Sequence, residues 1–387
     1  MDERVRFIGD WLSGDFSKGR LCAAYGISRP TGDKWIRRYC EQGLEGLSAR
    51  SCAPQCHPNQ TPAWQQQQIV ELRRARPWFG PKKIIDYLKR TEPDFCWPAD
   101  STAGAILKRA GLVAARRGRR RIAPDSQPFH QCDRPNQVWS ADFKGHFRVR
   151  NGAWCYPLTL TDNYSRYLLV CRGLPRTAGV LARPWFERAF REWGLPTALR
   201  TDNGAPFASR ALGGLSALSK WWIRLGIKPE RIEPAKPSQN GRHERMHRSL
   251  KAATLRPPKQ SLPAQQRAFN RFIYEYNEER SHESLGRKVP AQFHQRSAKE
   301  YPSRLEPIEY PKEYTVRSVR HSGEIKWKGQ LLFVSEVLAK DPIGLHPVAD
   351  GQWDIYFSFY KIGSLDEREQ KIVPCQYWHG TKEESVN

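Results

Sequence analysis

The chain has 387 residues, enough for roughly two to four domains and at least one sizeable hydrophobic core. It carries 64 Lys and Arg against 40 Asp and Glu, a formal net charge of +24, which favours a polyanionic partner such as nucleic acid. A membrane span is excluded, because no apolar run approaches the roughly 20 residues that cross a bilayer. The N-terminus lacks a secretory signal, and nine scattered cysteines indicate reduced thiols, so we expect a cytoplasmic protein.

Residues 1–55 predict a helix-turn-helix DNA-binding domain. Apolar residues recur at helical spacing over residues 3–13 and 18–25, and Gly26 follows the second helix as its C-cap. A three-helix bundle of any function would share this periodicity. The tight turn and the basic residues of a third helix favour DNA binding, and the residues expected to contact DNA are Arg29, Lys34, Arg37 and Arg38.

Residues 56–115 predict a second helical domain of the helix-turn-helix type. Three amphipathic helices are expected there, over residues 64–74, 81–90 and 102–111. A basic linker over residues 116–135 follows, and it includes five arginines in six positions: Arg116, Arg117, Arg119, Arg120 and Arg121. Such a run does not pack into a core. We expect it to follow the phosphates of DNA, although a solvated linker would have the same composition.

From residue 136 to residue 300 the pattern is that of an α/β domain. Short aromatic and β-branched runs predict strands over residues 138–147, 154–161 and 166–172, with a turn at 162–165 between the last two. Helices and strands then alternate along the chain. This order predicts a mixed sheet with helices on its faces.

Three acidic residues of this block stand at positions suited to a metal site. Asp142 lies within a strand, Asp202 lies just past a strand end, and Glu244 lies on the helix that follows the sheet. Metal-assisted phosphoryl transfer uses oxygen ligands that hold two Mg²⁺ ions about 3.5–4 Å apart. We therefore expect Asp142, Asp202 and Glu244 to be catalytic and to bind two Mg²⁺ or Mn²⁺ ions.

The helix that contains Glu244 also supports a different reading. Residues 243–247 spell H-E-x-x-H, the helical zinc motif of metalloproteases. Asn240, Gly241 and Arg242 precede the motif, where a protease of this type has apolar helical turns. A zinc protease is therefore kept as the remote alternative. Asp162 repeats the Asp-Asn pair of Asp202, but its place at a strand end indicates a turn-capping role.

Helical spacing places Glu244, His247, Arg248 and Lys251 on one face. We expect this face to be exposed and its two cations, Arg248 and Lys251, to contact DNA beside the metal site. A solvated charged face with no partner is the competing interpretation. The opposite side of the helix, with Met246 and Leu250, is expected to pack on the core.

Residues 301–387 predict a C-terminal β domain. Short strands at regular spacing dominate from about residue 302, a pattern typical of a small β-barrel. A DNA-holding module and a plain packing domain are equally compatible with this sequence.

The motifs WSADFKG, LTDNYSRY, RTDNGAPF and PSQNGRHERMHRSLK resemble the catalytic core of insertion-sequence transposases of the retroviral-integrase superfamily. The resemblance covers about residues 136–300 and extends to the N-terminal helix-turn-helix modules. It implies an RNase H-like fold and an Asp, Asp, Glu triad, matched here by Asp142, Asp202 and Glu244. The interval between the last two is 42 positions, longer than is common in the family, and we expect an insertion around residues 210–220.

The resemblance also implies a reaction and its partners. These are cleavage at the terminal repeats of a mobile element and transfer of the 3′-hydroxyl into target DNA, by a homo-oligomer assembled on double-stranded DNA in a bacterial nucleoid. A DNA-binding regulator with an inactive core is the main alternative. The presence of all three acids favours the enzyme, because an inactive core would be free to lose them.

Overall fold

The computed structural model describes residues 3–49, 60–113, 132–232 and 241–375, and the chain divides into two compact units, Met1–Thr61 and Pro62–Asn387. The first unit contains the three expected helices: α1 (Glu3–Leu12), α2 (Lys18–Ala24) and α3 (Arg29–Gln42). Phe7, Leu21 and Ile36 form its core. A Cβ atom at Gly32 of α3 would lie 2.6 Å from Sγ of Cys22 on α2, so glycine permits the close crossing of these two helices.

A second helical module begins the second unit. It consists of α4 (Ala63–Ala75), α5 (Pro81–Thr91) and α6 (Asp100–Arg109), which pack around Ile69, Ile84 and Leu107. Pro81 stands in the first turn of α5, where a backbone donor is not needed. The three helices predicted for this segment are therefore confirmed in type and order.

The second module contacts the central domain through ion pairs, hydrogen bonds and aromatic contacts. Arg76 pairs with Glu279 at 2.6 Å, and Arg287 pairs with Asp86 at 2.6 Å. The rings of Trp78 and Phe272 lie 5.3 Å apart. The side chains of Arg76 and Glu279 are each 14% exposed, so their ion pair is shielded from water.

We expect Arg76→Ala to lower the free energy of unfolding by about 2 kcal/mol, because it leaves the carboxylate of Glu279 without its cation in a shielded position. Glu279→Ala should have a similar effect, and the double variant should cost much less than the sum of the two. Chemical denaturation of the four proteins measures this coupling. Additive costs would show that the pair does not stabilise the contact.

The central domain is built on a six-stranded mixed sheet in the order β2-β3-β1-β5-β6, with β4 paired to β3. Its strands are β1 (Val138–Phe143), β2 (Phe147–Arg148), β3 (Trp154–Asp162), β4 (Leu168–Leu174), β5 (Ala198–Thr201) and β6 (Lys228–Arg231). β1, β5 and β6 run parallel to one another, whereas the pairs that β3 forms with β1, β2 and β4 are antiparallel. The prediction of a mixed sheet is confirmed.

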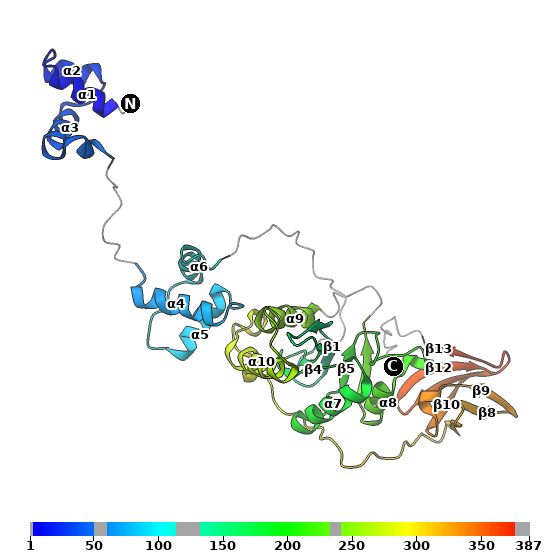
Figure 1. The fold of residues 1–387 in the computed structure, drawn as a ribbon. Helices are drawn as coiled ribbons and strands as arrows, with labels where there is room; N and C mark the ends of the chain where they lie inside the picture. The colour runs from blue at the N-terminus through cyan, green and yellow to red at the C-terminus, as the bar shows by residue number, and fades with distance from the viewer. Residues whose placement is uncertain (1–2, 50–59, 114–131, 233–240, 376–387) are drawn as a thin grey trace. The chain divides into compact units, whose positions relative to one another are not determined.

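Helices cover both faces of this sheet (Figure 1). α7 (Gly179–Trp193) and α8 (Ala217–Arg224) pack on the face that presents Trp139, Ala141 and Leu160. α9 (Gly241–Thr254) and α10 (Leu262–Tyr274) pack on the other face. Because side chains alternate along a strand, the residues between those apolar ones on β1 and β3 point toward α9.

The C-terminal region forms an open antiparallel sheet of five strands in the order β13-β12-β11-β10-β7, and β8 and β9 form a separate hairpin. The bounds are β7 (Thr315–Ser318), β8 (Glu324–Trp327), β9 (Gln330–Phe333), β10 (Pro342–Ala349), β11 (Gln352–Phe357), β12 (Tyr360–Asp366) and β13 (Lys371–Pro374). The expected strands are confirmed, but the expected barrel closure is not shown. Within the described residues β7 and β13 do not pair, and the two strands left over pair with each other.

The C-terminal sheet shares its hydrophobic core with the central domain. Leu212, Leu215 and Ile223, from the segment before α8 and from α8 itself, pack among the buried side chains of the sheet. Gly213 has φ 64°, and a Cβ atom there would lie 3.0 Å from Cβ of Ile362 on β12. Glycine thus lets the segment approach the sheet closely. None of the described helices combines the length and apolar composition that a bilayer crossing requires.

Candidate active site

The three predicted acids lie at one end of the central sheet or on the helix that covers it. Asp142 is the fifth residue of β1, and Asp202 directly follows β5. Arg200 pairs with Ser140 in the parallel register of these strands, so Asp202 is level with Asp142 on the neighbouring strand. Glu244 lies in the first turn of α9 and is exposed.

The electrostatics of Asp142 link it to both other acids. Burial, together with the negative charges of Asp202 and Glu244, raises the pKa of Asp142 to about 7. Burial also raises the pKa of Asp202, against a lowering effect of the hydrogen bond that the Gly204 backbone donates to it. Partly buried carboxylates that repel one another are a donor set that a divalent cation stabilises. The residues present therefore fit a Mg²⁺ or Mn²⁺ site.

A buried hydrogen-bond network joins α9 to the sheet beside Asp142. Oγ1 of Thr159 lies 2.7 Å from Nε2 of His243, 2.8 Å from Nε2 of His247 and 3.0 Å from the carbonyl oxygen of Asp142. Oγ1 of Thr161, on the same face of β3, lies 2.9 Å from Nδ1 of His243. Burial lowers the pKa of both imidazoles, that of His243 to about 3, so both rings are neutral at physiological pH.

This network corrects one sequence prediction. His247 was expected on the exposed face with Glu244, but its side chain is 5% exposed and its Nδ1 lies 3.7 Å from Oδ2 of Asp142. Glu244, Arg248 and Lys251 are exposed as expected. The helical period places these four residues on a face that covers about a third of the helix surface. His247 lies at the edge of this face, and its side chain points into the domain. The sequence patterns did not predict a role for Thr159 and Thr161, although residues two apart on a strand lie on the same face of the sheet.

The same network argues against the zinc protease alternative. In an H-E-x-x-H site the two histidines direct one nitrogen each at a common Zn²⁺ ion. Here the Nε2 atoms of His243 and His247 both converge on the hydroxyl of Thr159, inside the domain. The glutamate between them lies on the exposed side of α9.

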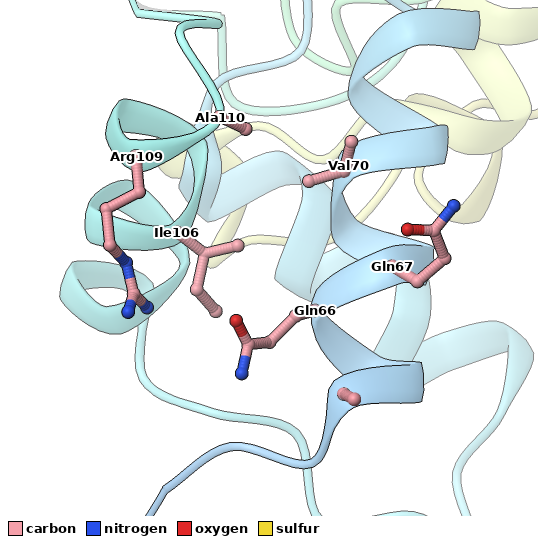
Figure 2. Close-up of a pocket in the computed structure, with 7 residues that line it drawn as sticks. Gln66, Gln67, Val70, Ile106, Arg109 and Ala110 are labelled. Atoms are coloured by element: carbon pink, nitrogen blue, oxygen red, sulfur yellow. The ribbon is translucent and has the colours of Figure 1, made fainter.

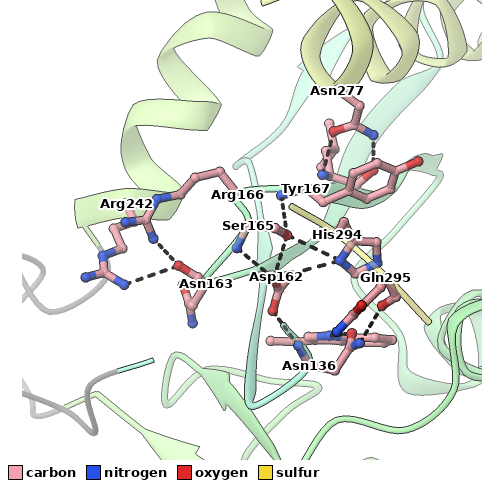
Figure 3. Close-up of polar contacts among 12 residues, drawn as sticks. Asn136, Asp162, Asn163, Ser165, Arg166, Tyr167, Arg242, Asn277, His294 and Gln295 are labelled. Carbon is pink, nitrogen blue, oxygen red and sulfur yellow. Dashed lines mark hydrogen bonds and ion pairs between the residues drawn. The ribbon is translucent and has the colours of Figure 1, made fainter. Parts of the chain in front are cut away.

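Asp162 has the structural role that its position predicted (Figure 3). Its carboxylate accepts hydrogen bonds from the backbone of Ser165 at 2.8 Å and of Asn136 at 3.0 Å, and it is fully buried. Asp162 pairs with Trp139 in the sheet, whereas Thr159 pairs with Asp142. Three residues of strand, about 10 Å, therefore separate Asp162 from Asp142. The turn after β3 holds this acid away from the other three.

The residues predicted to bind DNA are mostly accessible where the structure describes them. Arg29, Lys34 and Arg37 of α3 are exposed, and Arg38 is half-buried. The five arginines of the linker, from Arg116 to Arg121, lie outside the described residues.

In the second module, Gln66 of α4 and Arg109 of α6 line a hollow of about 390 Å³ between these two helices (Figure 2).

Five protein-family matches cover most of the chain. Integrase core domain families match residues 133–237 and 225–290, and the C-terminal domain of the IS481 family transposases matches residues 314–373. Upstream, a helix-turn-helix domain matches residues 3–54 and a homeodomain-like domain matches residues 31–107. Along the chain, helix-turn-helix and homeodomain-like families are thus followed by integrase-core families and then by a transposase C-terminal domain.

Individual proteins show the same likeness. The chain is 31% identical over 264 residues to an uncharacterized 39.2 kDa protein of insertion element IS476 from Xanthomonas euvesicatoria, covering 66% of this chain and 71% of that protein. A 31.7 kDa protein of insertion element IS407 from Burkholderia multivorans is 27% identical over 262 residues, covering 66% and 89%. The HTLV-2 integrase catalytic core, solved in complex with magnesium, is 19% identical, with a TM-score of 0.34 and coverage of 43% and 100%.

The family matches and the relative from Xanthomonas agree with the fold, in which helical modules precede a mixed-sheet domain and an antiparallel C-terminal sheet. The chain belongs to the insertion-sequence transposases, with N-terminal helix-turn-helix domains and an integrase, or DDE transposase, catalytic core, and its C-terminal region matches the corresponding domain of the IS481 family.

Proposed function

We propose that this transposase binds the terminal repeats of its element, cleaves the DNA strand there in a metal-dependent reaction, and joins the 3′-hydroxyl to target DNA. Asp142, Asp202 and Glu244 are the metal ligands and catalytic residues of this reaction. The observation that carries the proposal is that Asp202, level with Asp142 on the neighbouring strand, and Glu244 on α9 both raise the pKa of the partly buried Asp142.

The three carboxylates prepare the site for cations and for a phosphate. Two Mg²⁺ or Mn²⁺ ions, when bound, activate the attacking oxygen and neutralise charge on the leaving one. Asp142 is held rigidly by its strand, and its oxygens become available as a full anion above about pH 7. The Gly204 backbone N–H, 3.3 Å from Oδ1 of Asp202, orients the second carboxylate. Glu244 faces solvent, from where DNA would approach.

We assign DNA recognition to the regions before the core. Residues 1–55 and 56–115 would read the terminal repeats, residues 116–135 would follow phosphates as a basic linker, residues 136–300 would carry out catalysis, and residues 301–387 would support the complex. A homo-oligomer assembled on double-stranded DNA in the bacterial nucleoid fits this division, because the two ends of an element must be brought together.

A cleavage assay tests the proposal. Full-length protein is incubated with DNA that carries the element's own ends, with Mg²⁺, and strand cleavage and joining are followed on a denaturing gel. Cleavage at the ends is the expected result. Binding to these ends without cleavage in either Mg²⁺ or Mn²⁺ would instead identify a regulator with an inactive core.

Lys251→Ala should weaken binding to pre-cleaved ends and lower the slope of log affinity against log salt by about one unit. Lys251 and Arg248 lie two turns and one turn beyond Glu244 on the exposed side of α9, so the DNA backbone next to the cleavage site would pass near them. Fluorescence anisotropy over a range of salt concentrations measures the slope.

Arg245→Ala is the matched control, because Arg245 is exposed on the same helix but about 100° away from Glu244. That variant should leave the slope nearly unchanged. Equal slopes for Lys251→Ala and the wild-type protein would show that Lys251 only solvates the helix.

A further inference from the structure

The network around Thr159 determines which ring nitrogen of each histidine carries its proton. A threonine hydroxyl has one hydrogen to donate, and the carbonyl oxygen of Asp142, 3.0 Å away, can only accept it. The Thr159 oxygen must then accept from Nε2 of His243 at 2.7 Å and from Nε2 of His247 at 2.8 Å. Each neutral imidazole is therefore protonated on Nε2 and has a lone pair on Nδ1.

The two Nδ1 atoms face different groups. Nδ1 of His243 accepts a hydrogen bond from the Thr161 hydroxyl at 2.9 Å. Nδ1 of His247 faces Oδ2 of Asp142 at 3.7 Å, and the ion pairs recorded among the described residues give that carboxylate no lysine or arginine partner. A nitrogen lone pair and a carboxylate oxygen that face each other are two acceptors without a donor between them. A cation satisfies both.

The separation of these two atoms suits a shared metal ion. Two ligand atoms at bond lengths near 2.1 Å lie about 3.0 Å apart at an octahedral angle and about 3.4 Å apart at a tetrahedral angle. A small rotation of either side chain closes 3.7 Å to that range. His243 belongs to the same cluster, within which the possible ligand atoms lie within 4.8 Å of one another, but both of its nitrogens are engaged.

We propose that Nδ1 of His247 joins Oδ2 of Asp142 in binding one divalent metal ion, so that one metal position has a mixed nitrogen and oxygen donor set. This assignment rests on the proposed function, in which Asp142 is a metal ligand. Imidazole contributes little to binding of Mg²⁺, which prefers oxygen, and more to binding of Mn²⁺ and Co²⁺. His247 would therefore shift the ion preference of the site from Mg²⁺ toward Mn²⁺ and Co²⁺.

Pulsed electron paramagnetic resonance of the full-length protein loaded with Mn²⁺ tests the assignment. A coordinated imidazole gives Mn²⁺ a ¹⁴N coupling that oxygen ligands do not give, and ¹⁵N-histidine labelling should convert it to a ¹⁵N pattern. His247→Gln should lose the coupling, because its amide still reaches Thr159 but places no atom at the position of Nδ1. The affinity of the His247→Gln protein for Mn²⁺ should fall about tenfold or more, whereas its affinity for Mg²⁺ should fall by less than about twofold.

His243→Gln is the control and should keep the coupling, since neither nitrogen of His243 is available to a metal. A wild-type spectrum without nitrogen coupling overturns the assignment even if a variant fails to fold, and so does a folded His247→Gln protein that retains it. The proposed function is tested separately by Asp142→Asn. Normal cleavage by that variant would refute the proposed function, whereas an inactive Asp142→Asn protein and an uncoupled wild-type spectrum would refute the role of His247 alone.

Discussion

Asp202→Asn is expected to reduce strand cleavage at least about a thousandfold, which corresponds to about 4 kcal/mol of lost transition-state stabilisation. The substitution preserves the shape of the side chain and removes the charge that, in the proposed site, would hold a cation between β5 and β1. The Gly204 N–H that now contacts Asp202 can still bond to the amide oxygen, so the local turn should persist. Cleavage is measured on element-end DNA with Mg²⁺, and DNA affinity is measured on the same preparation.

DNA affinity should change little, because the predicted DNA contacts lie on other residues. Asp350→Asn provides the matched control: it is the same chemical change at an exposed carboxylate in the turn between β10 and β11, and it should cleave normally. Robust cleavage by Asp202→Asn would remove Asp202 from the site. A similar loss of cleavage in the control would point to a general defect of Asp-to-Asn variants.

Asp142→Asn should make the metal-free protein more stable at pH 8, by about 2–4 kcal/mol in the free energy of unfolding, while it abolishes cleavage. The folded protein holds Asp142 with a pKa of about 7, above the ordinary value of 3.8. A folded pKa above the unfolded one stabilises the protein at low pH, and this contribution is lost as the pH rises to about 7. Asparagine does not ionise, so the variant avoids the loss.

Chemical denaturation of both proteins between pH 4 and pH 8 measures this difference. It should be small near pH 4, grow as the pH rises to about 7, and then level off. Mg²⁺ should stabilise the wild-type protein and reduce the gap, because a ligand that binds the folded state alone stabilises it. A constant difference at all pH values would show that Asp142 is not the group with the raised pKa.

The elements that carry the acids could be predicted because each has a strong local signal. β1 and β5 are short runs with strand propensity, and the sequence of α9 has a helical period, so Asp142 lies within the expected strand, Asp202 directly after one, and Glu244 on the expected helix. Strand register, in contrast, depends on which strands pair with each other, and local sequence patterns do not give the pairing. That Asp202 is level with Asp142 is visible only once β1 pairs with β5.

The environment of His247 could not be predicted for a related reason. Helical periodicity gives the angle between residues around a helix, but it does not give the direction in which a mixed face points. His247 contacts Thr159 and Asp142, which lie on two strands more than 80 residues earlier in the chain. Strand spacing likewise does not reveal that β8 and β9 pair with each other, and the expected closure of a barrel is not shown within the described residues.

The packing of Leu212, Leu215 and Ile223 against the C-terminal sheet limits how that sheet can be exchanged among transposases. A chimera made by cutting near residue 305 would inherit a foreign sheet that does not fit these three side chains, and a truncation there would leave them facing water. Gly213 adds a steric requirement, because it admits no side chain against Ile362. The natural unit of exchange is therefore the sheet together with the segment before α8 and α8 itself, and their sequences should change in concert during evolution.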